Sequence, residues 1–472
     1  MPPEIARTPD RSPRIAIVGA GPAGFYTAAA LLAQTAVDGP RIDLLDRLPT
    51  PYGLVRYGVA PDHPKIKEVV RVFEKVALDA RVRFLGNLEV GRDLSLADLA
   101  AHYDQVVFSV GGQSDRRLGV PGEDLPGSHS STALVAWYSS HPDFRELPVD
   151  LSVAAAAVIG AGNVAVDVAR ILGRNPEDLA ATDISDDALA RLRASRIRDV
   201  HFIVRRGPVQ AKWSPAELKE LAHLPGVDLV VDRQDLELDP GSELELADDP
   251  QAQKSLEILR AAAERGLTGA ARRIHLHFRR SPVAIEGESE GEGGAGSGRV
   301  AGLRLERNRL VGAAGSLSAK GTGEVSSLPV GLVVRAVGYR SLPLRDLPFD
   351  VQRAVIPNQR GRIFDAFDGS PLASLYVAGW IKRGPTGLIG TNKPDGYETA
   401  EAMLEDLPSL PRAAGAPIDE LLAARGLCPV DFADWKRLDR IEVERGLPAG
   451  RPRVKFSRVE EMLAALAAEP VS

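Results

Sequence analysis

Three glycines near the start of the chain have the spacing of a turn that binds a dinucleotide. Gly19, Gly21 and Gly24 form the pattern GxGxxG in "GAGPAG", between the apolar run "RIAIV" and the helix-like segment "FYTAAALLAQ". The first glycine permits the tight bend, the second lets a pyrophosphate approach the backbone, and the third lets the helix lie close to the strand. Asp46 ends the next apolar segment, where a carboxylate is expected to bind a ribose hydroxyl. The pattern predicts a dinucleotide site, with a glycine-rich turn that binds nothing as the alternative.

A second turn of this kind lies in "VIGAGNVAVD". Gly160 and Gly162 keep the spacing, but Ala165 stands at the third position, which allows slightly looser packing of helix on strand. Asn163 is placed where its side chain could reach the dinucleotide. In both turns the start of the following helix offers free N–H groups and a positive dipole end to the phosphates. We therefore expect a second dinucleotide site, with plain packing of the turn as the alternative.

Two adjacent arginines end the strand that follows the second turn. A unit that binds NAD or FAD has Asp or Glu there for the ribose hydroxyls, whereas "HFIVRRG" has Arg205 and Arg206. A carboxylate would repel a 2′-phosphate, and guanidinium groups bind it in bidentate fashion. A polar helical insertion at about 176–198 separates these arginines from the turn. The second dinucleotide is therefore predicted to be NADP, with a solvated basic pair as the alternative; Glu217 is either a further ribose contact or a surface helix residue.

The order of these patterns predicts the domain organisation. Strand–turn–helix patterns open the chain and recur from residue 153, and the glycine-rich "GPTGLIG" near residue 387 enters a further helix that would complete the first unit. The fold class is therefore α/β, with two doubly wound dinucleotide-binding domains. We expect a discontinuous dinucleotide-binding domain, residues 1–115 and 334–472, with an inserted NADP domain, residues 116–333. The last part of the chain, from about residue 415, is predicted to be a helical tail without assigned chemistry.

One helix, one loop and the first residues of the chain are predicted in more detail. "KIKEVVRVFEKVAL" predicts a single helix with Ile66, Val69, Val70, Phe73 and Val76 on one apolar face. The polar, glycine-rich stretch 286–299 predicts a flexible surface connection. The first residues are polar and rich in proline and lack an apolar signal core, so a cytoplasmic location is expected.

The composition excludes several classes of function. The net charge of −6 argues against a general nucleic-acid binder, and no apolar run is long enough to span a membrane. The single cysteine, Cys428, excludes a dithiol redox pair and a cysteine-ligated iron–sulfur cluster within this chain. The eight histidines show no metal-ligand spacing. His275 and His277 share a strand face, but two ligands without a third make only a weak metal site, so no metal is expected.

Longer motifs in the chain resemble the adrenodoxin-reductase-like ferredoxin–NADP⁺ reductases. "GAGPAGFYTA", "PYGLVRYGVAPDHPKIK", "GAGNVAVDVARIL", "VRRGP" and "YVAGWIKRGPTGLIGTNK" occur in this order, and the likeness runs from about residue 14 to about residue 406. The resemblance implies non-covalently bound FAD, NADPH as hydride donor and a ferredoxin-type iron–sulfur protein that exchanges single electrons with the flavin.

By matching motif positions, the resemblance also implies which residues bind the cofactors. The FAD set is Gly19, Ala20, Gly21, Ala23, Gly24, Asp46, Leu54, Val90, Trp380, Gly387, Leu388 and Ile389. The NADP set is Gly160, Gly162, Asn163, Val164, Arg205, Arg206, Glu217 and Gly387. The catalytic set is His63, Asp167 and Trp380, at positions close to the flavin and the nicotinamide. His63 with Asp167 could relay a proton, or only make a structural hydrogen bond; Trp380 could face the rings, or only pack in the core.

The electron acceptor is the least determined part of the prediction. Mitochondrial members dock an acidic ferredoxin through basic residues of the NADP domain, but here the comparable stretch "DPGSELELADDPQAQKSL" is mostly acidic and would repel a negative partner. Basic groups elsewhere are Arg272, Arg273, Arg279, Arg280, Lys382 and Arg383. The alternatives are an NADPH diaphorase for quinones or other small acceptors, a flavin monooxygenase, and a nucleotide-binding module without catalysis. The direction of electron flow and the oligomeric state stay open.

Overall fold

The first sheet combines segments from both ends of the chain. The computed structural model describes residues 12–35, 39–288, 298–365 and 367–468. In spatial order its strands are β16 (Asn358–Gln359), β17 (Arg362–Phe364), β18 (Pro371–Val377), β4 (Gln105–Phe108), β1 (Arg14–Val18), β2 (Arg41–Leu45) and β3 (Val82–Leu85). The strands from β18 to β3 are parallel, with β16 and β17 antiparallel at one edge. β1 is an uninterrupted apolar run after its first residue because alternate side chains enter two different buried clusters, one on each face.

The second sheet is entirely parallel and comes from the middle of the chain. Its strands, in spatial order, are β6 (Ser128–Ser130), β14 (Leu332–Ala336), β7 (Ala155–Gly160), β8 (Asp199–Val204), β10 (Arg272–Phe278) and β9 (Val227–Val231). We call the parts of the chain that carry the two sheets the first and the second domain. The predicted α/β fold with one doubly wound domain inserted into another is confirmed. Strand pairing extends the insert through all of β14, beyond the predicted boundary at 333.

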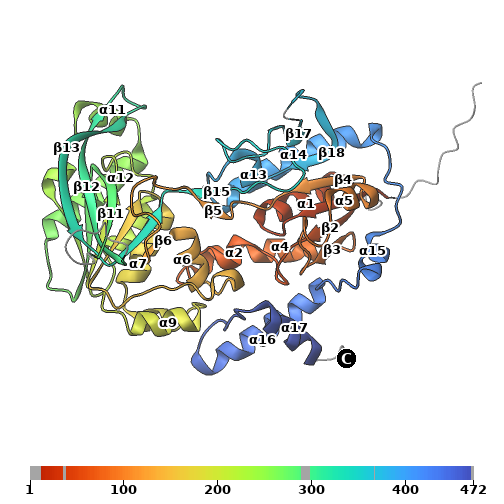
Figure 1. Cartoon of the computed structure of the whole chain (residues 1–472), viewed down its shortest axis with the longest axis horizontal. Helices are drawn as coiled ribbons and strands as arrows, with labels where there is room; N and C mark the ends of the chain where they lie inside the picture. Colours follow the sequence, from red (N-terminus) through yellow and green to blue (C-terminus); the bar gives the residue numbers. More distant parts are fainter. Residues whose placement is uncertain (1–11, 36–38, 289–297, 366, 469–472) are drawn as a thin grey trace, which may run out of the picture.

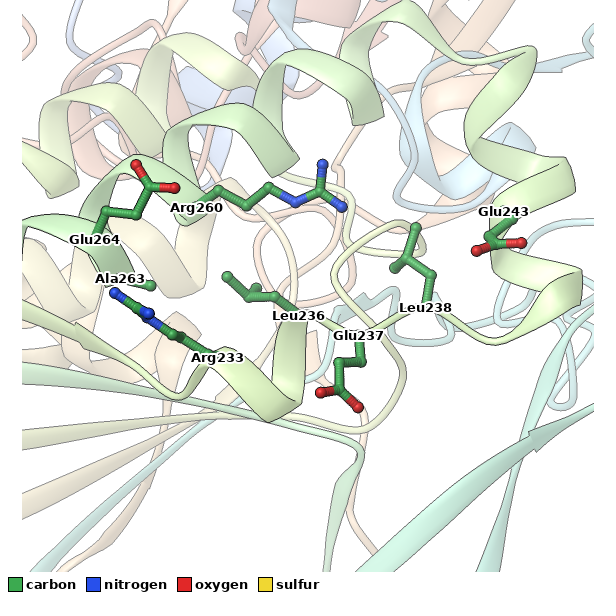
Figure 2. Close-up of a pocket in the computed structure, with 8 residues that line it drawn as sticks. All are labelled: Arg233, Leu236, Glu237, Leu238, Glu243, Arg260, Ala263 and Glu264. Atoms are coloured by element: carbon green, nitrogen blue, oxygen red, sulfur yellow. The ribbon is translucent and has the colours of Figure 1, made fainter.

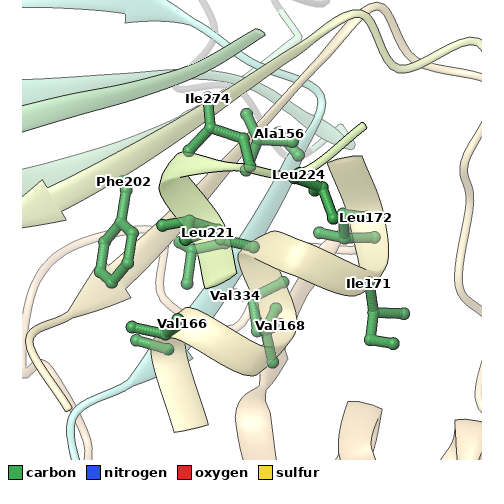
Figure 3. Packing of buried hydrophobic residues seen from close by; sticks show 14 of the residues in the cluster. Ala156, Val166, Val168, Ile171, Leu172, Phe202, Leu221, Leu224, Ile274 and Val334 are labelled. Atoms are coloured by element: carbon green, nitrogen blue, oxygen red, sulfur yellow. The ribbon is translucent and has the colours of Figure 1, made fainter. Parts of the chain in front are cut away.

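Helices complete both domains, and apolar side chains fill the space between helices and sheets. The first domain has α1 (Pro22–Gln34), α2 (Leu54–Tyr57), α3 (Pro64–Lys67), α4 (Val70–Ala77), α5 (Leu96–His102), α13 (Trp380–Arg383) and α14 (Asn392–Asp406). The second has α6 (Ser131–Tyr138), α7 (Asn163–Gly173), α8 (Pro176–Leu179), α9 (Asp186–Arg193), α10 (Pro215–Ala222), α11 (Pro240–Ala247) and α12 (Pro250–Arg265). Figure 3 shows the core of the second domain, where Val166 and Val168 of α7 lie near Phe202 of β8 and Val334 of β14. Within the described ranges, no helix combines the length and the apolarity needed to cross a membrane.

A third sheet was not predicted from the sequence. β11 (Arg280–Gly287), β12 (Val300–Val311) and β13 (Ser318–Pro329) form an antiparallel sheet that packs on the second sheet through Ile285, Leu303 and Leu305. β13 carries the polar sequence "SAKGTGEVSSLP" and is exposed along nearly its whole length. It lacks the alternation of apolar and polar residues by which a half-buried strand is recognised.

The predicted single helix over "KIKEVVRVFEKVAL" is wrong, because the structure divides it into α3 and α4. At the break the N–H groups of Glu68 and Val69 bond to carbonyls three residues back, so the backbone tightens and the helix does not continue in one direction. Phe73 and Val76 are buried as expected, but Ile66 is 43% exposed. The predicted loop at 286–299 and the predicted signal-free start lie largely outside the residues that the structure describes.

Two thin connections join the domains. β5 (Ser114–Asp115) leaves the first domain and β15 (Tyr339–Arg340) returns to it, and the two pair in an antiparallel manner. Figure 1 shows this pair between the two domains, and the helices α16 and α17 beyond the opposite side of the first domain, toward α9 of the second. The tail consists of α15 (Ile418–Ala424), α16 (Phe432–Gly446) and α17 (Val459–Ala468).

The tail is anchored in the core of the first domain by a buried ion pair. Glu442 of α16 receives two hydrogen bonds from Arg56, at 2.9 and 2.5 Å. The side chains of Glu442 and Arg56 are 0% and 4% exposed, and the guanidinium of Arg56 lies 4.9 Å from the ring centre of Trp435. Trp435 itself packs in the apolar cluster that contains Phe25 and Phe73.

Loss of Glu442 should therefore destabilise the protein strongly. Glu442→Ala leaves the Arg56 guanidinium buried and unpaired, which should lower the free energy of unfolding by about 3–5 kcal/mol. Urea unfolding followed by tryptophan fluorescence measures this. Glu444→Ala on the same helix is the matched control, because Glu444 pairs with Arg440 at 3.9 Å in an exposed position. Equal effects of the two substitutions would contradict the assignment of a buried anchoring pair.

Candidate functional site

The first glycine turn is shaped by close backbone contacts. Gly19 has φ +107°, and a Cβ added there would lie 2.7 Å from the carbonyl oxygen of Ser109, the residue that follows β4. A Cβ at Gly24 would lie 2.1 Å from the carbonyl oxygen of Gly19, so α1 can approach β1 only without a side chain at this position. Gly21 differs, because its nearest neighbour is the Cα of Gly53 at 4.0 Å. Gly19 and Gly24 are thus required by the fold, whereas Gly21 leaves space beside the start of α1.

The residues predicted to bind FAD come together around this turn. Tyr52, two residues before Leu54, donates its backbone N–H to the carbonyl of Ala20. A Cβ at Gly379, next to Trp380, would lie 2.5 Å from the side chain of Ala23 on α1. The segments of Leu54 and Trp380 therefore both meet the first turn, although they are far apart in the sequence.

Asp46 links the end of β2 to the first turn through hydrogen bonds. Its carboxylate accepts hydrogen bonds from the backbone N–H of Ala20 at 2.9 Å and of Leu48 at 3.0 Å. Burial raises the pKa of the Asp46 carboxyl, while these two N–H groups act in the opposite direction. The carboxylate thus stands at the end of β2, beside the turn, as predicted from the sequence.

The other predicted FAD contacts lie on half-exposed surfaces. Val90 lines a pocket of about 200 Å³ together with Phe108 and Leu344. The ring centres of Trp380 and Tyr339 lie 5.0 Å apart, and the indole N–H of Trp380 is buried without a hydrogen-bond partner in the described structure.

The turn that is predicted to lie at the flavin ring is open to solvent. Gly387 has φ +79°, Leu388 is 68% exposed, and Ile389 begins a short 3₁₀ turn before α14. A buried indole donor without a partner in the described structure fits a site whose ligand supplies the missing contact.

The second turn repeats the first, with a different neighbour. A Cβ at Gly160 would lie 2.4 Å from the carbonyl oxygen of Ala336, whereas a Cβ at Gly162 would meet nothing within 4 Å. The side chain of Asn163 accepts a hydrogen bond from the backbone N–H of Ser214 at 2.9 Å, which fixes the start of α10 beside the turn. Val164 follows on α7 and is half-buried.

The helix starts at the two turns lack side-chain caps. The N-cap residues of α1 and α7 are Gly21 and Gly162, so neither helix has a side-chain hydrogen bond at its N-cap. By contrast, serine side chains cap α6, α9 and α10. The first N–H groups of α1 and α7 are therefore left for another acceptor, and space exists at both positions, which fits the phosphates of two dinucleotides.

Arg205 and Arg206 stand at the end of β8 without acidic partners in the described ranges. Arg206 donates only to the carbonyls of Leu317 and Gln210, at 3.4 and 3.3 Å, and the side chain of Arg205 is exposed. Most arginines of this chain are paired with carboxylates, so two guanidinium groups free of such pairs at the strand end fit an external phosphate.

A cluster of titratable groups joins the two domains. His63, at the start of α3, lies 3.1 Å from Glu220, 3.7 Å from Glu217 and 4.0 Å from Asp167. Its side chain is 10% exposed. Asp167 lies on α7 and Glu217 on α10, so the cluster brings a first-domain imidazole against second-domain carboxylates. Glu217 is 15% exposed and faces this cluster; it is not a surface residue.

A buried arginine organises the cluster, and the sequence analysis missed it. Arg170 is 1% exposed and donates to Asp62 at 2.8 and 3.1 Å, to Asp167 at 2.9 Å and to Glu217 at 3.2 Å. Asp62 also accepts from Arg174 at 2.5 Å. The available signal was a charged residue inside the apolar run "VARIL", three positions after Asp167.

The surroundings separate the acidities of the carboxyls. Burial raises the pKa of Asp167 to about 6, against the opposing effect of Arg170, and the nearby Glu217 carboxylate adds to the rise. Burial alone would also raise the pKa of Asp62, but its hydrogen bonds from the Arg170 guanidinium lower it below the usual value. Asp167 is therefore the carboxyl of this cluster that changes its charge nearest to neutral pH.

The basic groups considered for a partner are mostly engaged in the fold. Lys382 is buried and pairs with Asp395 at 3.0 Å and Glu398 at 2.6 Å. Arg273 pairs with Asp199 at 2.7 Å, and Arg279 donates to the carbonyls of Glu237 and Gln234. Lys382 in particular cannot offer its charge to a partner at the surface.

A pocket lies over the acidic stretch of the second domain. It has a volume of about 360 Å³ and is lined by Arg233, Leu236, Glu237, Leu238, Glu243, Arg260, Ala263 and Glu264 (Figure 2). None of the predicted site residues lines it. The pocket belongs to the outer surface formed by α11 and α12 and has no part in the cluster around His63.

Comparisons with known proteins agree with this geometry. The chain is 46% identical to the NADPH-ferredoxin reductase FprA of Mycobacterium tuberculosis over 462 residues, which cover 95% of this chain and 98% of that protein. It is 42% identical to the mitochondrial NADPH:adrenodoxin oxidoreductase of Homo sapiens over 471 residues, 97% of this chain and 92% of that protein. The solved structure of Mycobacterium tuberculosis FprA in complex with NADPH superposes with a TM-score of 0.89 at 44% identity, covering 97% of this chain and all of that one.

The sequence profile of the pyridine nucleotide-disulphide oxidoreductases matches residues 13–249, which contain both glycine turns and the whole cluster around His63. The chain thus belongs to the pyridine nucleotide-disulphide oxidoreductase family and, within it, to the adrenodoxin-reductase-like ferredoxin–NADP⁺ reductases.

Proposed function

We propose that this protein is an FAD-dependent NADPH–ferredoxin reductase. The observation that carries the proposal is the cluster in which His63 and Asp62, from the domain of the first glycine turn, meet Asp167 and Glu217 of the domain with the second turn. Two dinucleotides bound at such turns would direct their reactive ends toward the junction of the domains. The relatives named above, at 42–46% identity over nearly their full length, support the same activity. A cytoplasmic location remains part of the proposal.

The residues around the first turn would hold FAD. The space beside Gly21, the uncapped start of α1 and the carboxylate of Asp46 would receive the adenosine diphosphate part, and Trp380 with the turn at Gly387 would lie at the ring end. When bound, FAD supplies a ring system that accepts two electrons together and releases them one at a time. The backbone N–H groups of the exposed turn before α14 can stabilise negative charge on that ring.

The residues of the second domain would bind and orient the substrate NADPH. Gly162 and the start of α7 would receive its pyrophosphate, and Arg205 with Arg206 its 2′-phosphate. The side-chain oxygen of Asn163 accepts from Ser214 and so holds α10 and Glu217 beside the turn, while its NH2 group would be the part that reaches the nucleotide. Hydride transfer needs no side-chain acid or base, and the main contribution of the protein is to bring two rings to the right separation.

Asp167 and Glu217 have an electrostatic role in this proposal. NADPH that gives up a hydride leaves a positively charged nicotinamide ring, and fixed carboxylates stabilise such developing charge. His63, within reach of both carboxylates and of Glu220, is placed to exchange a proton with solvent.

The activity can be tested on the purified flavoprotein. NADPH should bleach its yellow colour under anaerobic conditions, and NADH much less. Reduction of cytochrome c should then depend on an added ferredoxin, because the flavin would pass single electrons to the iron–sulfur protein. A protein that bleaches but reduces quinones equally well without ferredoxin would be a diaphorase; a protein that NADPH does not bleach is no reductase.

The arginine pair predicts the choice of nucleotide. Each charge-assisted hydrogen bond to the 2′-phosphate contributes about 1.5–3 kcal/mol. Arg205→Gln/Arg206→Gln should therefore raise the NADPH concentration for half-maximal bleaching by about 100-fold or more, since about 1.4 kcal/mol corresponds to a factor of ten. The NADH requirement should stay nearly constant. Arg260→Gln, an exposed arginine of the same domain, is the control. If the required concentrations of NADPH and NADH rise equally, the two arginines do not bind the 2′-phosphate.

The raised pKa of Asp167 predicts a pH dependence. Asp167 is neutral below about pH 6 and negative above it, so the rate of bleaching at saturating NADPH should rise with pH through about pH 6. Asp167→Asn should remove this rise and lower the rate at pH 7.5. Stopped-flow absorbance between pH 5 and 8 measures both effects. An unchanged profile in the variant would assign the inflection to another group.

A further inference from the structure

Two segments that the dinucleotide folds do not require meet each other at the domain junction. One is the polar insertion between α7 and β8, which forms α8, the loop 180–185 and α9. The other is the strand-free stretch 450–457 of the tail, between α16 and α17. The insertion is fixed to the second domain, because the indole N–H of Trp137 donates to Asp187 at 2.8 Å and the N–H of Ser185 donates to the carbonyl of Tyr138. The tail is fixed to the first domain through Glu442 and Arg56.

Arg451 connects the tail to this insertion. Its Nε donates to the carbonyl of Thr182 at 2.9 Å, and its two terminal nitrogens donate to the carbonyl of Ile184 and to the carboxylate of Asp186. The side chain of Arg451 is 6% exposed. All three acceptors lie in the second domain, so a guanidinium group of the first domain is hydrogen-bonded by oxygens of the second domain alone.

Lys455 reinforces the same contact. Its ammonium lies 2.9 Å from the carboxylate of Asp183 and donates to the carbonyls of Arg56, in the first domain, and Ser139, in the second. The side chains of Lys455 and Asp183 are 2% and 8% exposed. Burial lowers the pKa of Lys455 to about 7, against the attraction of Asp183. A buried ammonium group without its partners is energetically unfavourable, so Lys455 favours the arrangement of the two domains in which these contacts are made.

The carboxylate of Asp183 is also linked to the helix that begins at the candidate active site. Asp183 also accepts from Lys67 at 2.6 Å, and Lys67 ends α3, the helix whose N-cap is His63. The tail, the insertion and α3 are thus joined at one carboxylate. A shift of the insertion relative to α3 would also shift Asp167 and Glu217 relative to His63, because α7 and the insertion belong to one domain.

Covalent links alone do not fix the domains. Only the chain segments around the β5–β15 pair connect them, and polar interfaces between domains of one chain ordinarily permit rotation. Buried ion pairs add little net stability, but they specify one geometry, because other arrangements leave a charge buried without a partner.

We propose that Arg451 and Lys455 are positioning residues, which hold the second domain against α3 so that His63 stays beside Asp167 and Glu217 while NADPH reacts. The proposal rests on the proposed reductase function. It assigns a role to the tail and to the insertion, both of which lie outside the elements that bind the nucleotides.

The test uses the full chain loaded with FAD and measures anaerobic bleaching by NADPH in a stopped-flow instrument. The first variant is Arg451→Met, which leaves only two carbonyls and the exposed carboxylate of Asp186 without their partner; Lys455→Met is the second. Misplacement of reacting groups lowers the limiting rate, which we expect to fall roughly 10- to 100-fold. The NADPH concentration for half-maximal rate should change less than about twofold, because the nucleotide contacts lie within one domain.

Matched controls separate positioning from general damage. Lys436→Met removes a tail lysine that pairs with Glu74 of the first domain at 2.6 Å and makes no bridge to the second, so its bleaching should equal that of the unchanged protein. Chemical reduction of the flavin by dithionite, which does not need the second domain, should be equal in all variants. Rates expressed per bound flavin exclude the unfolded fraction.

Hydrogen exchange supplies a readout that does not depend on activity. Loss of the contacts of Arg451 and Lys455 should increase hydrogen exchange at the hinge, by which we mean the chain segments around the β5–β15 pair. One hinge amide is the N–H of Arg116, which donates to the carbonyl of Gly338. Folded variants with unchanged limiting rates and unchanged hinge exchange would overturn the proposal. A protein that NADPH does not bleach at all would overturn the reductase function instead, and the exchange measurement would still decide whether the tail holds the domains.

Discussion

The buried guanidinium of Arg170 is the interaction on which the candidate site depends. A charge that is 1% exposed has to be compensated nearby, and here the compensation comes from both domains: Asp62 from the first, Asp167 and Glu217 from the second. The same contacts that make the arginine tolerable therefore fix the two domains against each other. Burial raises the pKa of Asp167 even though Arg170 acts against the rise, whereas the hydrogen bonds from Arg170 lower the pKa of Asp62. Arg170 therefore both holds the junction together and influences the acidity of its carboxyls.

The rest of the architecture can be understood as support for this junction. Each glycine turn holds its own helix close to its own strand and has no means of reaching the other domain. The β5–β15 pair connects the domains on one side, and the contacts of Arg451 and Lys455 lie on the tail side. A rigid body held at two separated places cannot rotate freely about either one. This arrangement accounts for a tail whose apolar residues are buried in the first domain but whose charged residues reach the second.

The sequence predicted the parts of the protein that are determined locally. A glycine turn, its strand and its helix lie within about thirty residues, and steric requirements such as that at Gly24 are strict enough to be read from residue types. The two-domain insertion followed from the order of these units. The contact of His63 with Glu220 joins residues 157 positions apart, and no local pattern specifies it. Arg170 was missed for the same reason, since its partners are known only once the domains are assembled. β13 was not predicted because its polar residues do not alternate with apolar ones. The break after α3 was not predicted because the spacing of apolar residues does not show where the backbone tightens.

The cysteine content limits how electrons leave the site. The family profile that matches the first half of the chain is named for disulphide chemistry, yet this chain has a single cysteine, Cys428, exposed between α15 and α16 of the tail. A dithiol relay needs two thiols at bonding distance, so none can form within this chain. Electrons would therefore have to pass from the flavin to an acceptor without a dithiol intermediate within this chain. The turn at Gly387 and Leu388, which is exposed and rests on α14, is where the ring end is proposed to lie. Lys382 of α13, which precedes this turn in the chain, is buried in its pairs with Asp395 and Glu398, so it offers no free positive charge to a partner.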